Sequence, residues 1–83
     1  MKTFKDLKFD HQYSYPFAIQ AIERFDNGYG VSVLCGGSGI YSDGKTTYEV
    51  AILKGKDIED VYGFRTARQV TKIMREVQER EKI

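Results

Sequence analysis

Apolar and polar residues alternate along three runs of the chain, at residues 17–25, 29–35 and 47–53. A period of two is typical of β-strands that bury one face. Asp26-Asn27-Gly28 separates the first two runs, and it predicts a tight hairpin turn because Asn and Gly tolerate a positive φ. The pattern therefore predicts an antiparallel three-stranded meander over residues 17–53.

The pattern changes near the C-terminal end of the chain, where apolar residues recur every three or four positions from Ala67 to Val77. This spacing is typical of an amphipathic helix. Thr66 and Gln69 have the spacing of a capping box, in which each side chain binds the backbone of the other residue. We therefore expect a helix over residues 66–82, with its apolar stripe packed on the sheet.

The segments outside these elements have weaker patterns. Residues 1–16 mix helical and strand spacing and end in Pro16, so they predict an arm with a short edge segment or single turn, followed by a loop. Residues 58–62 can add a short fourth strand. The whole chain, residues 1–83, is thus predicted to be one α+β domain, an antiparallel sheet of three to four strands with the C-terminal α-helix packed on one face.

Composition narrows the classes of protein. The 83 residues have a net charge of +1, which argues against a strongly basic nucleic-acid binder and against an acidic mimic of DNA. Cys35 is the single cysteine, so no disulfide can form within the chain. No apolar run approaches the roughly 20 residues that span a bilayer, and the N-terminus lacks a secretory signal pattern. We expect a soluble protein of the cytoplasm.

One segment matches a catalytic motif by its letters. Residues 39–46 satisfy the phosphate-loop pattern G-x-x-x-x-G-K-[ST]. That loop binds phosphate through the N-terminus of a helix that starts directly after the lysine. Residues 46–53 here have strand character instead, so we predict a hairpin loop and expect no nucleotide cofactor.

Other reactive residues stand alone in the sequence. His11 is the single histidine, which argues against a metal site of the usual zinc type. Cys35 alternates with Val31 and Val33, as a small core residue does. The carboxylates of residues 57–60 are expected to form a solvated acidic turn. We therefore predict no catalytic residues, no metal and no enzymatic activity.

Two surfaces remain as candidate binding sites. Exposed aromatic and aliphatic side chains on a rigid support are common anchors for a protein partner. In this chain the candidates are Tyr13, Tyr15, Ile40 and Tyr41. The alternative is a nucleic-acid site on the basic side of the C-terminal helix. Its candidate residues are Arg65, Arg68, Lys72 and Arg75.

A family resemblance extends over about residues 17–77. The segment Phe25-Asp-Asn-Gly-Tyr-Gly-Val-Ser-Val33 resembles the F-[DE]-N-G-Y-x-x-S-V core of small accessory proteins from tailed bacteriophages. The runs Tyr48–Leu53 and Asp60–Phe64, followed by Thr66 and Val70, are similar to later motifs of that group in the same order. This chain differs in its short link between residues 53 and 60 and in Arg65, where the group has leucine.

The resemblance implies a phage accessory protein and assigns no catalytic residue. We expect a non-enzymatic protein of the host cytoplasm that binds a host or phage protein. Inhibition of a host defence system, of the anti-CRISPR or anti-restriction type, is the most concrete form of this function. A nucleic-acid-binding module is the alternative, and a homodimer stays open.

Overall fold

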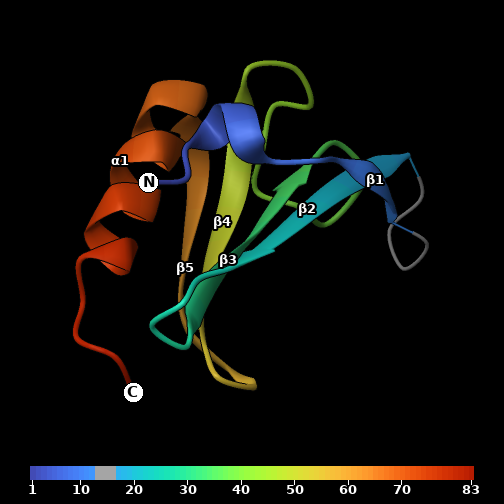
Figure 1. Ribbon diagram of the computed structural model, residues 1–83. Coiled ribbons are helices and arrows are strands. Elements are labelled where there is room, and N and C mark those ends of the chain that lie inside the picture. Colours follow the sequence, from blue (N-terminus) through green and yellow to red (C-terminus); the bar gives the residue numbers. More distant parts are fainter. Residues whose placement is uncertain (13–16) are drawn as a thin grey trace.

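The computed structural model describes residues 1–12 and 17–83, and it contains an antiparallel sheet with one helix on one side (Figure 1). Five strands follow one another in the sheet in the order in which they occur in the sequence. They are β1 (Asp10–Gln12), β2 (Ala18–Arg24), β3 (Tyr29–Cys35), β4 (Thr47–Lys54) and β5 (Asp57–Thr66). The predicted α+β class and meander are confirmed, but the sheet has five strands and not three to four.

The difference in strand number comes from the two edges. Strand β1 pairs with the start of β2. Because β1 has three residues, it is too short for an alternating pattern to be detected in the sequence. Strand β5 has ten residues, twice the length of the segment 58–62. Its register against β4 shifts twice, because Glu59 is one extra residue and Gly63 and Phe64 together oppose a single residue of β4. These bulges interrupt the alternation that would have marked a long strand.

Helix α1 (Ala67–Gln78) begins as expected and ends earlier than expected. The Gln69 N–H donates to the Thr66 hydroxyl at 3.3 Å and the Thr66 N–H donates to the Gln69 side chain at 2.8 Å, which confirms the capping box. Beyond Gln78 the chain folds back, and the Ile83 N–H donates to the Asn27 carbonyl at 3.0 Å. A helix to residue 82 was therefore wrong at its C-terminal end.

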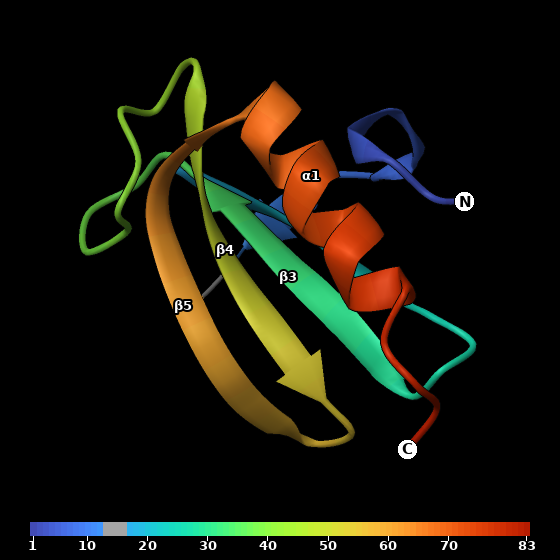
Figure 2. The same cartoon turned by 90° about the vertical axis from the view of Figure 1, so that its left-hand side faces the viewer.

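The core lies between α1 and one face of the sheet, called here the helix face. Val70, Met74 and Val77 of α1 are buried, and Val70 and Met74 join the core cluster. From the sheet and the N-terminal segment that cluster takes Leu7, Ala21, Val31, Val33 and Val50. Figure 2 shows α1 lying across this face, with the N-terminal segment beside it. A short 3-10 helix, η1 (Phe4–Asp6), is bound to α1 through the Phe4 N–H and the Thr71 hydroxyl, 3.1 Å apart.

The opposite face of the sheet, called here the far face, carries no helix formed by residues 1–12 or 17–83. A cross-strand row of directly opposed residues runs over it: Ile22, Ser32, Ala51 and Val61. Ile22 and Val61, at the two ends of this row, are exposed. The alternating run predicted over residues 17–25 includes Phe17, but Phe17 has a φ of 65° and is 92% exposed. The alternation therefore begins one residue later than the sequence suggests.

Candidate functional site

The loop that resembles a phosphate loop is filled by a carboxylate of the protein itself. The Asp43 side chain accepts the N–H groups of Lys45, Thr46 and Thr47 at 2.8–2.9 Å and the Thr46 hydroxyl at 2.7 Å. These hydrogen bonds, led by that of the Thr46 hydroxyl, hold the pKa of Asp43 well below its usual 3.8. Strand β4 starts at Thr47, so no helix follows Lys45. The backbone donors that a phosphate would need are thus already occupied.

The same loop brings Tyr41 against β5. The Phe64 N–H donates to the Tyr41 carbonyl at 2.8 Å, and the two rings lie 6.3 Å apart at an angle of 57°. Gly63 allows this approach, because a Cβ atom at Gly63 would lie 2.6 Å from the Tyr41 Cβ. Tyr41 and Phe64, called here the aromatic pair, are 61% and 57% exposed. An exposed pair of large rings therefore projects from the fold.

Phe64 has an unusual backbone conformation. Its φ is 52°, in the left-handed region where a bulky side chain is a clear outlier. This conformation costs roughly 1–2 kcal/mol for a residue with a Cβ. Burial of the ring would offset this cost, yet the ring remains more than half exposed. The folded state alone thus gains little from phenylalanine at this position.

The predicted partner-binding residues have different places in the structure. Tyr41 belongs to the aromatic pair, as an exposed anchor should. Ile40, its neighbour, is only 8% exposed and joins the buried residues, so it cannot serve as an exposed anchor. Tyr13 and Tyr15 lie outside the described residues.

The four predicted nucleic-acid residues do not all line the same groove. Arg65 and Lys72 line a groove of about 450 Å³ between α1 and β5, whereas Arg68 and Arg75 lie on exposed positions of α1 that do not line it. Within the groove, the Arg65 guanidinium lies 5.4 Å from the centre of the Tyr62 ring and donates to the Gly63 carbonyl at 3.2 Å. The groove also contains Glu76. The basic residues are therefore divided between the groove and the solvent side of the helix.

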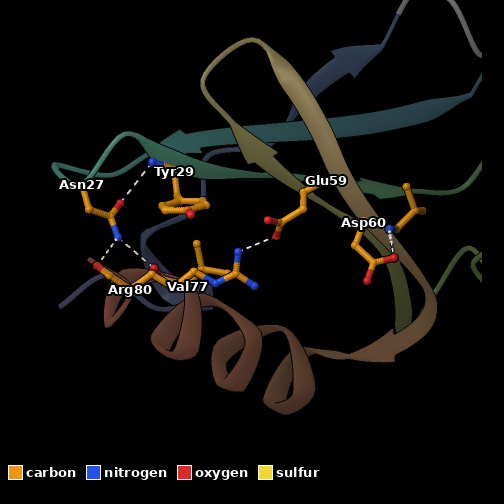
Figure 3. Close-up of polar contacts among 7 residues, drawn as sticks. Asn27, Tyr29, Glu59, Asp60, Val77 and Arg80 are labelled. Atoms are coloured by element: carbon orange, nitrogen blue, oxygen red, sulfur yellow. Dashed lines mark hydrogen bonds and ion pairs between the residues drawn. The ribbon is translucent and has the colours of Figure 1, made fainter. Parts of the chain in front are cut away.

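Polar contacts close the other end of the same groove (Figure 3). Arg80, just after α1, forms an ion pair with Glu59 of β5 and places its guanidinium 5.0 Å from the centre of the Tyr29 ring. The Asn27 amide donates to the carbonyls of Val77 and Arg80 at 2.9 and 3.1 Å, and its oxygen accepts the Tyr29 N–H at 3.1 Å. The β2–β3 turn thus holds the end of the helix.

The remaining reactive residues do not converge. Cys35 is buried, and its thiol lies 3.6 Å from the Thr47 carbonyl and 3.8 Å from the Ser42 hydroxyl. His11 lies in the same cross-strand row of the sheet, but Ile19 of β2 stands between His11 and Cys35. In residues 1–12 and 17–83, no group of three or more His, Cys, Asp or Glu residues could hold a metal ion. No described helix is both long enough and apolar enough to cross a membrane.

Sequence reasoning missed the structural roles of two residues, Phe64 and Asn27. Phe64 was noted only as part of a family motif, although its position directly after Gly63 at an interrupted alternation is the signal of a bulge. Asn27 was interpreted as a turn residue alone. The carbonyls that its amide binds lie 50 or more residues away, so no local pattern could reveal them.

Comparison with known proteins adds no relative to this picture: no protein-family model matches the chain, and no curated protein or solved structure matches it either.

Proposed function

We propose that this chain is a non-enzymatic accessory protein of a tailed bacteriophage that acts by binding a host or phage protein. The proposal rests on the resemblance of residues 25–33 to the core motif of such proteins and on the exposed aromatic pair. Its most concrete form is inhibition of a host defence complex of the CRISPR or restriction type, in the host cytoplasm.

The single observation that carries the proposal is Phe64. A glycine would adopt its φ of 52° without the steric cost, and the exposed ring adds little to the core. Strain that the fold does not need is a common property of functional positions. Tyr41 and Phe64 form a contiguous aromatic surface on a rigid sheet, and exposed apolar surface of this kind marks protein interaction sites.

A test begins with affinity capture of the tagged chain from host lysate. We expect Phe64→Gly to lose the captured partner while the free energy of unfolding stays within about 1 kcal/mol of the parent, because glycine relieves the strained φ but adds unfolded-state entropy. Ile22→Ala is the matched control, since Ile22 is an apolar residue of β2 that is about as exposed as Phe64. If the Phe64→Gly variant still captures the same partner, the aromatic pair is not the binding surface.

The defence-inhibitor form has its own readout. Expression of the chain in bacteria with an active CRISPR or restriction system should raise the plating efficiency of a targeted phage. Expression of Phe64→Gly at the same level should not. Equal protection by the parent and by Phe64→Gly would show that any inhibition does not depend on the aromatic pair.

A nucleic-acid-binding module is the second proposal. Arg65 and Lys72 lie along one groove, and Arg68 and Arg75 face solvent on the same helix. The net charge of +1 and the internal contacts of Arg65 weigh against it. We therefore rank protein binding first.

A further inference from the structure

Strand β5 forms one edge of the sheet and has β4 as its one neighbouring strand. Three large apolar side chains along it are exposed: Ile58, Val61 and Phe64. The Val61 N–H is bonded at 2.9 Å by the carboxylate of the preceding residue, Asp60, as Figure 3 shows for the Asp60 side chain. A side chain thus supplies the acceptor that a further strand would provide. Long exposed edges with apolar side chains are templates for strand addition.

The sequence of β5 is self-complementary about Val61. When two copies of the strand are placed antiparallel with Val61 opposite itself, Ile58 faces Phe64 and Asp57 faces Arg65 at both ends. Glu59, the extra residue of one bulge, faces Gly63 of the other bulge, and the Phe64 N–H stays bonded to the Tyr41 carbonyl of its own chain. Aliphatic–aromatic and opposite-charge pairs are favourable across strands. In this register no directly opposed pair places like charges together.

The faces of these side chains agree with such pairing. Ile58 and Val61 lie opposite Leu53 and Ala51, on the far face, whereas Asp57 and Arg65 lie opposite Lys54 and Tyr48, on the helix face. Residues opposed in an antiparallel pair must share a face, and Asp57 with Arg65 meets this condition. A two-fold axis through Val61 is the isologous arrangement that closes a dimer.

We propose that β5 pairs with β5 of a second copy, antiparallel and centred on Val61, to form a homodimer with one continuous sheet. Asp60 releases the Val61 N–H to the carbonyl of the second copy, and the carboxylate then faces Tyr62 of that copy. The dimer presents two copies of the aromatic pair. This inference goes beyond the proposed function, since it needs no host or phage partner.

Charge reversal tests the register. In sedimentation equilibrium between about 10 and 500 µM, we expect the parent to self-associate and Asp57→Arg and Arg65→Asp each to associate roughly 10- to 30-fold more weakly, because each places like charges at both ends of the interface. An equimolar mixture of the two variants should recover the parental affinity, since every charge pair in the heterodimer is again opposite.

No effect on folding can mimic that recovery, because the two variants are separate chains. A parent that stays monomeric at 500 µM, single variants that associate like the parent, or a mixture that fails to recover would each overturn the inference. If the protein is monomeric but still captures its partner through Phe64, the dimer inference is wrong and the proposed partner-binding function stands.

Oxidative trapping supplies a second measurement for variants that fold poorly. Directly opposed residues on a two-fold axis have Cα atoms about 5.5 Å apart, within the range of a disulfide. Val61→Cys should therefore give a covalent dimer under mild oxidation. Ile22→Cys should not, because Ile22 is exposed on the same face but lies on β2, with β3 and β4 between it and β5. Equal yields from the two variants would contradict pairing at β5.

Discussion

Asn27 connects two elements that are far apart in the sequence. Its side-chain amide reaches the carbonyls of Val77, Gln78 and Arg80, which belong to the end of α1 and the residues after it. Carbonyls at the end of a helix have no intrahelical donor, so an outside donor stabilises them. The next residue, Gly28, has a φ of 88° and leaves room for Ile83, since a Cβ there would lie 2.6 Å from the Ile83 Cγ1.

We predict that Asn27→Ala lowers the free energy of unfolding by about 1–3 kcal/mol, because several partly buried hydrogen bonds are lost together. Asn27→Asp should lower it further, since a carboxylate would face three carbonyls and the negative end of the helix. Urea denaturation measures both changes. Asp26→Ala, at the exposed neighbouring position, should change stability by less than about 0.5 kcal/mol. Equal stability of Asn27→Asp and the parent would show that the amide donors do not matter.

At the scale of elements, the loop between β3 and β4 is organised by Asp43. The hydrogen bonds that it accepts favour its charged form, and this lowers its pKa. A carboxyl whose folded-state pKa lies below the unfolded value of 3.8 stabilises the fold above that pH. The stabilisation is lost as the pH falls below 3.8 toward the folded-state pKa.

We therefore predict that Asp43→Asn melts at a lower temperature than the parent at pH 7, and that the difference narrows as the pH falls from about 5 to 2. Thermal melts followed by circular dichroism at several pH values measure this. Asp26→Asn reports the effect of removing a carboxylate from another turn. A melting difference that stays constant over the whole range would mean that the charge of Asp43 contributes nothing.

The whole molecule carries a mild charge asymmetry. Residues 61–83 contain six basic and three acidic side chains, whereas residues 31–60 contain three basic and five acidic ones. In the structure, Arg68, Lys72 and Arg75 are exposed on α1, while the acidic residues Asp57, Glu59 and Asp60 lie in the first half of β5. One side of the molecule is thus modestly basic, over an area that a few phosphates could cover.

We expect this basic side to give negligible duplex DNA affinity at about 150 mM salt, because three phosphate contacts supply little binding free energy. Fluorescence anisotropy over a salt series measures the affinity. Submicromolar binding with a log–log salt slope near −3, removed by Arg68→Glu together with Arg75→Glu, would instead support the nucleic-acid module.

Local chemistry decided much of the fold. The alternation of residues 29–35 and 47–53, the Asp26-Asn27-Gly28 turn and the Thr66–Gln69 capping box each act within a few residues, so the sequence alone predicted them, and the structure has them in place. Local reasoning also distinguished residues 39–46 from a true phosphate loop, because the residues after Lys45 have the composition of a strand and not of a helix.

Tertiary contacts decided the rest. The length of β5 depends on pairing with β4 across two bulges, and the end of α1 depends on Asn27, which is 50 residues away from Val77. The exposure of Phe64 and the burial of Ile40 follow from how the loop after β3 packs over β5. Such outcomes depend on which distant segments pack together, and the local sequence of one segment does not specify the segment that it contacts.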